Sequence, residues 1–200
     1  AGTSDISITK DGTIIAFGMI PTAGDSLTEI IANHCMVDFN TAEMIKRKGS
    51  TSESVEYEDI MGIKQSISKS QLQTLLKKQI ATMASLAAQK IKELNGEKSV
   101  GAVFVVGGGG MIPGYTKQLS EELGLPNERV QLRGKEVMQN IIFEDNELNI
   151  NSLLVTPIGI CLNFYEQDNN FIFVNFYTYL YPRKACNILI HHLDFFYLIC

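Results

Sequence analysis

The spacing of hydrophobic and polar residues changes along the chain and predicts an ordered series of strands and helices. Residues 5–9 alternate polar with apolar side chains, and residues 14–20 form a second β-rich run. Between these runs lies Lys10-Asp11-Gly12-Thr13, whose Asp-Gly pair is typical of a tight turn. We therefore expect the chain to open with a β-hairpin.

Two helix start signals follow the hairpin. Ser26-Leu27-Thr28-Glu29 has the spacing of a capping box, in which a serine and a glutamate satisfy free N–H groups at a helix start. Asn40-Thr41-Ala42-Glu43 repeats this pattern with asparagine as the predicted cap, and Gly49 is placed to end a helix over 41–48. The sequence therefore predicts two short helices.

The middle of the chain predicts an insertion followed by a long helix. Residues 49–69 contain many Ser, Glu and Gly residues, as is typical of a loop-rich segment. Within it, residues 54–58 have the pattern of an exposed strand. Residues 70–95 keep apolar side chains at the helical period, and Gly96 follows as a stop. We expect about 49–95 to hold a small inserted subdomain and the longest helix.

The next segment has the order strand, glycine loop, helix, which is typical of an α/β fold. Residues 100–106 form a continuous apolar run, as in a strand buried on both faces, and lead into four glycines, Gly107 to Gly110. Pro113-Gly114 then starts an amphipathic helix that Gly124 closes. Three further elements are predicted: a strand at 129–132, a helix from Thr156-Pro157 and a strand at 171–174.

Composition restricts the classes of function. The chain has 200 residues, of which 45% are hydrophobic, so it can bury the core of one domain or slightly more. Its net charge of −5 is not that of a nucleic-acid binder. The four cysteines lack C-x-x-C spacing, which argues against a zinc site or a disulfide scaffold and fits a reducing cytoplasm; they are Cys35, Cys161, Cys186 and Cys200.

Both ends of the chain have unusual sequences. The first residues include neither an initiator Met nor the pattern of a signal peptide, and we expect the chain to begin inside a motif. Residues 177–200 are rich in aromatics and contain a His191-His192 pair, and charged residues interrupt their apolar run. We expect 1–176 to form the folded domain and 177–200 to be an atypical aromatic-rich tail.

The four glycines are the strongest candidate for chemistry. Residues without Cβ let backbone N–H groups approach a phosphate or nucleoside at the end of a buried strand. The dinucleotide fingerprint fails here because Ile112 and Pro113 stand where its last glycine is needed, and the P-loop fails because Tyr115 replaces the lysine. The alternative is a loop that only packs a strand against a helix.

Four motifs in one order resemble the actin-like ATPases, the family that includes actin, DnaK-type chaperones and bacterial FtsA. They are Ala1-Gly2-Thr3-Ser4-Asp5, similar to the end of the second phosphate loop; Ala23-Gly24-Asp25; Thr41 to Arg47, similar to the Ala-Glu-x-x-Lys helix; and Val105 to Gly114, similar to the adenosine motif. The resemblance covers about residues 1–176 and is greatest for FtsA. It implies an α/β fold, namely the second lobe of the ribonuclease H-like actin ATPase architecture.

The resemblance also implies a set of nucleotide-binding residues. The phosphates would be bound by Gly2, Thr3 and Ser4, and the ribose side would be formed by Gly24 and Asp25. The ribose and base would be reached by Glu43, Lys46 and Arg47. Adenosine would be bound by Gly107, Gly108, Gly109, Gly110, Met111 and Ile112. The alternative is that Glu43 only caps a helix with Asn40 and that Lys46 only belongs to a cationic helix end. No catalytic or metal-binding residue is assigned, because the first phosphate loop and the catalytic Asp of the family would precede Ala1. We therefore expect no turnover by this chain alone.

By the same resemblance, the parent protein would bind ATP with Mg²⁺, form polymers at the cytoplasmic face of the membrane and recruit the tubulin-like division protein. Two alternatives stay within the superfamily: a DnaK-like chaperone lobe, and a pilus-assembly or microcompartment type of actin homologue that acts as a nucleotide-dependent scaffold. A Rossmann-type dehydrogenase domain is a third alternative, against which the glycine spacing counts.

Overall fold

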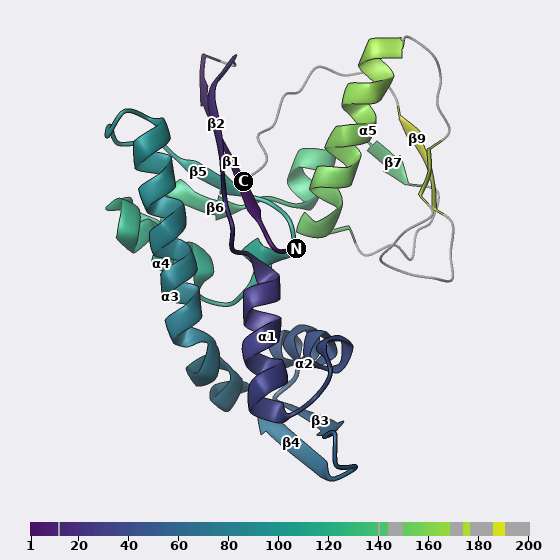
Figure 1. Cartoon of the computed structure of the whole chain (residues 1–200). Coiled ribbons are helices and arrows are strands. Elements are labelled where there is room, and N and C mark those ends of the chain that lie inside the picture. Colours follow the sequence, from purple (N-terminus) through teal and green to yellow (C-terminus); the bar gives the residue numbers. More distant parts are fainter. Residues whose placement is uncertain (12, 140, 144–149, 169–173, 177–185, 191–200) are drawn as a thin grey trace.

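The computed structural model describes residues 1–11, 13–139, 141–143, 150–168, 174–176 and 186–190 (Figure 1). The chain opens with an antiparallel hairpin of β1 (Ser4–Lys10) and β2 (Thr13–Ile20). Ile6 and Ile8 of β1 are buried, and their partners Gly18 and Ala16 lie beside them on the same face of the hairpin. The predicted hairpin is confirmed.

The first helix, α1 (Gly24–Cys35), begins three residues earlier than the capping-box pattern predicts. Its N-cap is Ala23, which makes no side-chain capping bond. Ser26 lies inside the first turn, where its hydroxyl donates to the Ala23 carbonyl at 3.1 Å. The predicted capping box at Ser26 and Glu29 is therefore wrong, because the serine bonds back to the preceding residues instead of accepting from the helix start.

The second helix, α2 (Phe39–Thr51), is also longer than predicted. The Asp38 carboxylate caps it by accepting hydrogen bonds from the N–H groups of Asn40 and Thr41, at 2.8 and 3.1 Å. Gly49 is buried inside the helix and does not end it. The predicted cap, Asn40, lies in the first turn, because a better acceptor stands two residues before it.

The segment after α2 forms a second hairpin from β3 (Ser54–Glu58) and β4 (Lys64–Ser68). Val55 and Ile67 are opposite each other in this hairpin, and both are buried. The strand over 54–58 is as predicted, whereas β4 was not predicted from the sequence.

The long helix α3 (Lys69–Leu94) carries much of the core and follows the predicted bounds closely. Ser68 and Gln71 form a capping box at its start. Its buried side chains recur at the helical period and pack toward the first hairpin, α1 and α4; they are Leu72, Leu76, Met83, Ala84, Ala87, Ala88 and Ile91. At Gly18 of β2 this packing is so close that a Cβ would lie 2.9 Å from Leu94 Cδ1.

After α3 the chain forms a parallel strand pair joined by a helix, the α/β unit that the sequence predicts. Strand β5 (Val103–Val105) pairs with β6 (Val130–Leu132), and the connection consists of η1 (Gly109–Met111), α4 (Tyr115–Leu123) and η2 (Asn127–Arg129). Gly114 and Gly124 bound α4 in the left-handed conformation, with φ of +88° and +66°. Strand β5 is shorter than the apolar run 100–106.

The remaining described elements lie toward the C-terminus. They are η3 (Lys135–Met138), β7 (Ile141–Phe143), η4 (Ser152–Leu154), α5 (Val155–Asp168), β8 (Val174–Phe176) and β9 (Cys186–Ile190). Strand β9 pairs antiparallel with both β7 and β8. The predicted strand at 171–174 meets β8 only at Val174, because 171–173 lie outside the described residues. Within the predicted tail, 177–185 and 191–200, including His191 and His192, lie outside them as well.

Figure 1 shows α3 running along one side of the molecule, with the first hairpin and the β5–β6 pair near its C-terminal end. Helices α1 and α2 and the β3–β4 hairpin lie toward its N-terminal end, and α5 with β7 to β9 lies on the other side of the first hairpin. Within the described part of the chain, no helix has the length and apolar character needed to cross a membrane.

Candidate functional site

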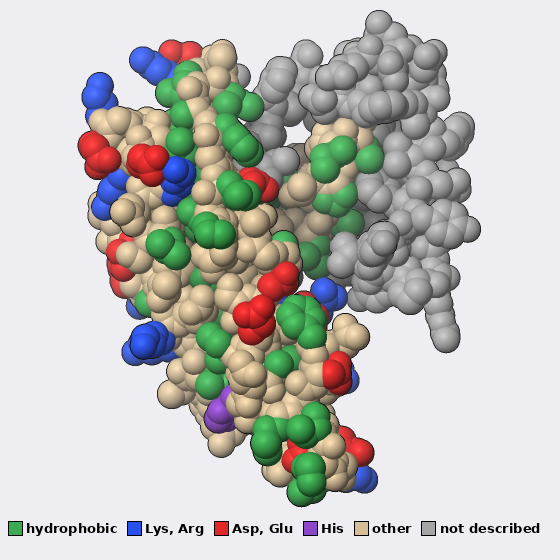
Figure 2. Space-filling view, viewed as in Figure 1, with side chains coloured by type: hydrophobic (Ala, Val, Ile, Leu, Met, Phe, Trp, Pro, Cys, Tyr) green, Lys and Arg blue, Asp and Glu red, His purple; other side chains and the backbone are tan. Residues whose placement is uncertain are grey.

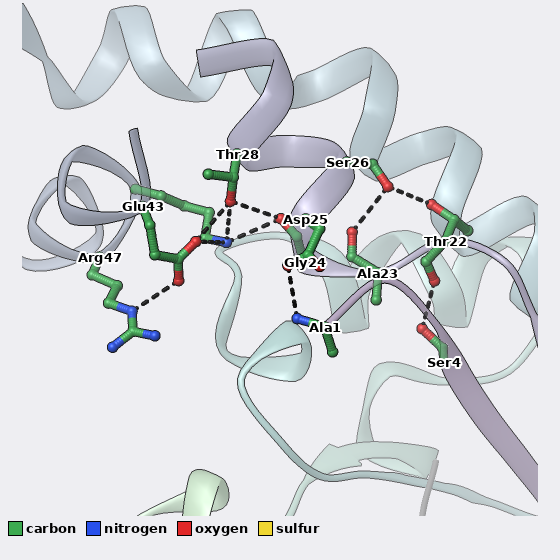
Figure 3. Close-up of polar contacts among 11 residues, drawn as sticks. Ala1, Ser4, Thr22, Ala23, Gly24, Asp25, Ser26, Thr28, Glu43 and Arg47 are labelled. Carbon is green, nitrogen blue, oxygen red and sulfur yellow. Dashed lines mark hydrogen bonds and ion pairs between the residues drawn. The ribbon is translucent and has the colours of Figure 1, made fainter. Parts of the chain in front are cut away.

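A cluster of five residues joins the start of α1 to the middle of α2 (Figure 3). We name it the Glu43 cluster, and its members are Gly24, Thr28, Glu43, Lys46 and Arg47. The Lys46 ammonium group donates to the Gly24 carbonyl at 3.0 Å and to Thr28 Oγ1 at 2.7 Å. It also lies 2.6 Å from Glu43 Oε2, so one cation binds together residues that are far apart in the sequence.

The Glu43 carboxylate is held in its charged form by its neighbours. Burial by itself raises the pKa of this carboxyl, but hydrogen bonds from Lys46, Thr28 and Arg47 lower the pKa from its ordinary 4.5 to about 2. The ion pair with Lys46 is partly shielded from water, because the side chains of Lys46 and Glu43 are only 15% and 25% exposed. The Glu43 carboxylate is therefore negatively charged at neutral pH, and it is paired with both Lys46 and Arg47.

Arg47 lies at the outer side of the cluster. Its Nε donates to Glu43 Oε1 at 2.8 Å, and its side chain is 55% exposed. A guanidinium carries five N–H donors, so this single bond leaves donors free to reach a ligand. Arg47 is thus the member of the cluster best placed to contact a bound molecule.

Thr28 is the residue of the cluster that was not predicted from the sequence. It is fully buried, and its hydroxyl donates to Glu43 Oε2 at 2.7 Å while accepting from Lys46. A threonine inside a helix matches no ligand-binding motif, so its sequence position gives no signal. Only the packing of α1 on α2 shows that it sets the positions of Glu43 and Lys46.

The predicted phosphate and ribose segments lie next to each other. Asp25 N–H donates to the Ala1 carbonyl at 3.1 Å, and a Cβ on Gly2 would lie 3.7 Å from Asp25 Oδ2. The Ser4 hydroxyl donates to the Thr22 carbonyl at 2.8 Å and so ties the hairpin to the chain before α1. Thr3 is exposed and has no polar partner among the described residues.

Two of the four glycines after β5 are explained by packing. A Cβ on Gly108 would lie 2.9 Å from Leu153 Cδ2. A Cβ on Gly110 would lie 2.6 Å from Val105 Cγ1 and 2.7 Å from Leu132 Cδ1. At Gly110 the contact with the β-branched Val105 side chain requires glycine, as the packing alternative expects, whereas at Gly108 the neighbour is the end of a flexible leucine side chain.

The other two glycines face open space. Gly107 has a φ of +85°, and its N–H and carbonyl both bond to Ser152, at 3.0 and 3.2 Å. A Cβ on Gly107 or Gly109 would have no neighbour within 4 Å, and Met111 is 43% exposed. Ile112 is partly buried against the core. In the glycine turn, Gly107 to Gly110, side-chain packing therefore does not require glycine at Gly107 or Gly109, although the positive φ of Gly107 favours glycine there.

In Figures 1 and 3 the teal ribbon of this glycine turn passes near Ala1 and the start of α1. The predicted phosphate, ribose and adenosine segments therefore lie in one region of the molecule. Among the residues that the structure describes, no three His, Cys, Asp or Glu side chains lie together as a metal site.

Comparisons with known proteins agree with this architecture. The model of the family described as cell division protein FtsA matches residues 1–152. The ethanolamine utilization protein EutJ from Carboxydothermus hydrogenoformans has a similar solved structure, with a TM-score of 0.54 and 27% sequence identity. The match covers 80% of this chain but only 46% of that protein, so the chain spans less than half of its relative.

No curated protein matches the chain in sequence. The family match nevertheless covers most of the chain, and the structural relative has an actin-like ATPase fold. The chain belongs to the FtsA family and has the α/β fold of the actin-like ATPases.

Proposed function

We propose that this chain is the nucleotide-binding lobe of an FtsA-like division protein and that it holds the adenosine part of ATP or ADP. The observation that carries this proposal is the Lys46 ammonium group, which bonds to the Gly24 carbonyl and to Glu43. Both segments resemble nucleotide-binding motifs, and the fold brings them within hydrogen-bond distance. A cationic helix end alone would not require Lys46 to turn back toward α1.

The chemistry of the two surfaces suits the two halves of a nucleoside. A carboxylate such as Glu43 accepts hydrogen bonds from ribose hydroxyls, and the exposed guanidinium of Arg47 donates to ribose or base acceptors. The open backbone at Gly107 and Gly109 lets a planar base approach closely. A Cβ at either position would intrude into that space.

The phosphates would lie toward Gly2 and Thr3, where an exposed hydroxyl and backbone N–H groups are free to donate. Mg²⁺ bound to the phosphates would neutralise part of their charge. We assign the phosphate side to this segment and keep Ser4 as a secondary contact, because its hydroxyl already donates to Thr22.

The parent protein is proposed to assemble into filaments at the cytoplasmic face of the membrane and to bind the tubulin-like division protein. Membership of the FtsA family supports this proposal. A second candidate is a nucleotide-dependent scaffold outside cell division. This candidate is supported by a structural relative of this fold that is named for ethanolamine utilization and not for cell division.

Calorimetric titration of Mg-ADP and Mg-ATP into the chain tests nucleotide binding. The informative variant is Arg47→Ala, because Arg47 is exposed and belongs to the Glu43 cluster. Its matched control is Lys48→Ala, which removes a neighbouring exposed cation outside the cluster. We expect Arg47→Ala to weaken binding by about threefold to tenfold, since it removes a charge-assisted hydrogen bond, and Lys48→Ala to leave the affinity unchanged.

The titration also has results that contradict the proposal. If the folded chain binds neither nucleotide, the assignment of an adenosine site fails. If Lys48→Ala weakens binding as much as Arg47→Ala, the effect is a general loss of positive charge, and the Glu43 cluster is not the site.

A further inference from the structure

Thr28 lies at the centre of the Glu43 cluster (Figure 3), in a part of α1 that the surface view of Figure 2 leaves largely covered. Its side chain is fully buried, and its Oγ1 atom is within hydrogen-bond distance of three groups. These groups are the Gly24 carbonyl at 3.1 Å, Glu43 Oε2 at 2.7 Å and the Lys46 ammonium group at 2.7 Å. One hydroxyl therefore connects the start of α1 to two charged residues of α2.

The single hydroxyl proton of Thr28 has two acceptors to choose between. A threonine inside a helix often donates to the carbonyl four residues earlier, which here belongs to Gly24. The Glu43 carboxylate is the stronger acceptor, because it is charged and because it lies nearer to the hydroxyl. The proton therefore points to Glu43, and the Gly24 carbonyl accepts from Lys46 instead.

The Lys46 ammonium group uses all of its donors inside the cluster. An ammonium group carries three N–H donors. Three acceptors surround that of Lys46, namely the Gly24 carbonyl at 3.0 Å, Thr28 Oγ1 at 2.7 Å and Glu43 Oε2 at 2.6 Å. The side chain is also largely shielded from water. Lys46 therefore neutralises charge within the cluster and has no donor left for a ligand.

The two oxygens of the Glu43 carboxylate differ in how far they are used. Each carboxylate oxygen accepts about two hydrogen bonds. Oε2 receives two bonds inside the cluster, from Thr28 and Lys46. Oε1 accepts one bond from the described residues, that of Arg47 Nε at 2.8 Å. Oε1 therefore keeps one acceptor position, and it lies beside the exposed guanidinium of Arg47.

We infer that Thr28 is a positioning residue of the adenosine site, which turns Lys46 and Glu43 Oε2 inward and leaves Oε1 as the acceptor for a sugar hydroxyl. This inference rests on the proposed function, in which Glu43 binds the ribose. A ribose hydroxyl is both a donor and an acceptor, so it can donate to Oε1 and accept from an N–H group of Arg47. The sugar is then recognised through Glu43 and Arg47 and not through Lys46.

Two substitutions of Thr28 separate the hydroxyl from the packing of the side chain. Thr28→Val removes the hydroxyl and nearly keeps the shape, whereas Thr28→Ser keeps the hydroxyl and removes a methyl group. In the chain without nucleotide, the Lys46 ammonium protons should give a slowly exchanging NMR signal, because all three are bonded. Thr28→Val should accelerate their exchange at least about threefold, and Thr28→Ser should stay close to the native rate. The exposed Lys48 is the control and should give no slowly exchanging signal.

Calorimetry with ADP and with its dideoxy analogue, which lacks both free ribose hydroxyls, tests the role of Thr28 in sugar recognition. The native chain should bind ADP about tenfold more tightly, because the analogue cannot bond to the Glu43 carboxylate. This preference should fall to about threefold or less in Thr28→Val, since the carboxylate is no longer fixed, and Thr28→Ser should keep it. Addition of ADP should shift the NMR signal of Arg47 Nε but not that of the Lys46 ammonium group. Circular dichroism confirms that each variant is folded.

The outcomes distinguish this inference from the proposed function. If the native chain binds ADP, the inference is overturned by an unchanged sugar preference in Thr28→Val, by an equal loss of preference in Thr28→Ser, or by a Lys46 signal that ADP shifts as much as that of Arg47. If the native chain binds neither nucleotide, the proposed function fails, and the role of Thr28 toward a ligand fails with it. Rapid exchange of the Lys46 ammonium protons in the native chain would overturn the inward placement of Lys46 without any nucleotide.

Discussion

Glu43 is the residue on which the polar contact between α1 and α2 depends. Its carboxylate accepts from Lys46, Thr28 and Arg47. We expect Glu43→Gln to lower the free energy of unfolding by about 1–3 kcal/mol, because it leaves the largely buried Lys46 ammonium without its counter-charge. Urea denaturation measures this. Arg47→Gln removes an exposed partner and should cost less than about 1 kcal/mol; an equal cost for both variants would contradict the proposed role of the buried pair.

The lowered pKa of Glu43 also determines how the free energy of unfolding should depend on pH. The pKa of Glu43 is lowered in the folded state to about 2 from its ordinary 4.5. Its stabilising contribution is therefore complete above pH 4.5 and is lost as the pH falls through about 2. Between pH 4.5 and about 2, we expect the native chain to lose more unfolding free energy than the Glu43→Gln variant loses. The difference should be on the order of 1 kcal/mol.

That comparison removes the contribution of other acidic groups. A hydrogen bond from the Thr41 hydroxyl lowers the pKa of the Asp38 carboxyl, so Asp38 also loses charge at low pH, but it does so in both proteins. Parallel pH profiles for the native chain and Glu43→Gln would show that Glu43 is not held as the structure describes.

The glycine turn allows stability and binding to be separated with two neighbouring substitutions. Gly110→Ala should lower stability by about 1–3 kcal/mol, because its Cβ would overlap Val105 and Leu132. Gly109→Ala should leave stability nearly unchanged, since its Cβ meets open space, yet weaken the binding of ADP. Thermal unfolding and calorimetry distinguish them. Unchanged ADP affinity in a folded Gly109→Ala variant would exclude the open face of Gly109 from the site.

At the level of the secondary-structure elements, Asp38 decides where α2 begins. Removal of its carboxylate in Asp38→Ala leaves the N–H groups of Asn40 and Thr41 without their acceptor and should cost about 1 kcal/mol in unfolding free energy. Asn40→Ala should be close to neutral, because Asn40 lies inside the first turn. A larger loss for Asn40→Ala than for Asp38→Ala would favour the cap predicted from the sequence.

The two helix starts show where sequence patterns fail. The spacing at Ser26 and Glu29 fits a capping box, but the Ser26 hydroxyl bonds to Ala23 and Thr22 instead. The pattern records which residue types are present and not which acceptor lies nearest in space. By contrast, the long helix was predicted closely, because its twenty-six residues repeat the apolar period many times.

The β4 strand was missed for a related reason. Its sequence, Lys64–Ser68, contains one apolar side chain, Ile67, and so gives no alternating pattern. Its structure depends on pairing with β3 and on the burial of Ile67 against the core, neither of which a five-residue window can show.

The candidate site was only partly predictable. The open glycines and the Glu43-Lys46 pair could be named from motifs that resemble a family, but their grouping depends on how α1 crosses α2. Thr28 could not be named at all, because its role exists only in that packing. The sequence also could not separate Gly108 and Gly110, which pack against side chains, from Gly107 and Gly109, which do not.

At the scale of the whole molecule, the fold places two kinds of surface in different regions. The Glu43 cluster and the glycine turn lie near the start of α1, whereas the exposed face of β2 runs along the first hairpin. The long helix α3 contacts α1, both strands of the first hairpin and α4, so it is the element that holds these regions in a fixed relation.

The measurement that tests the central claim most directly is hydrogen exchange of the chain with and without saturating Mg-ADP. The account predicts slower exchange in two segments that are far apart in the sequence, residues 24–28 with 43–47, and residues 107–112, because one bound nucleoside would cover both. Protection confined to one of these segments, or no protection in either while the fold is intact, would contradict the claim that they form a single adenosine site.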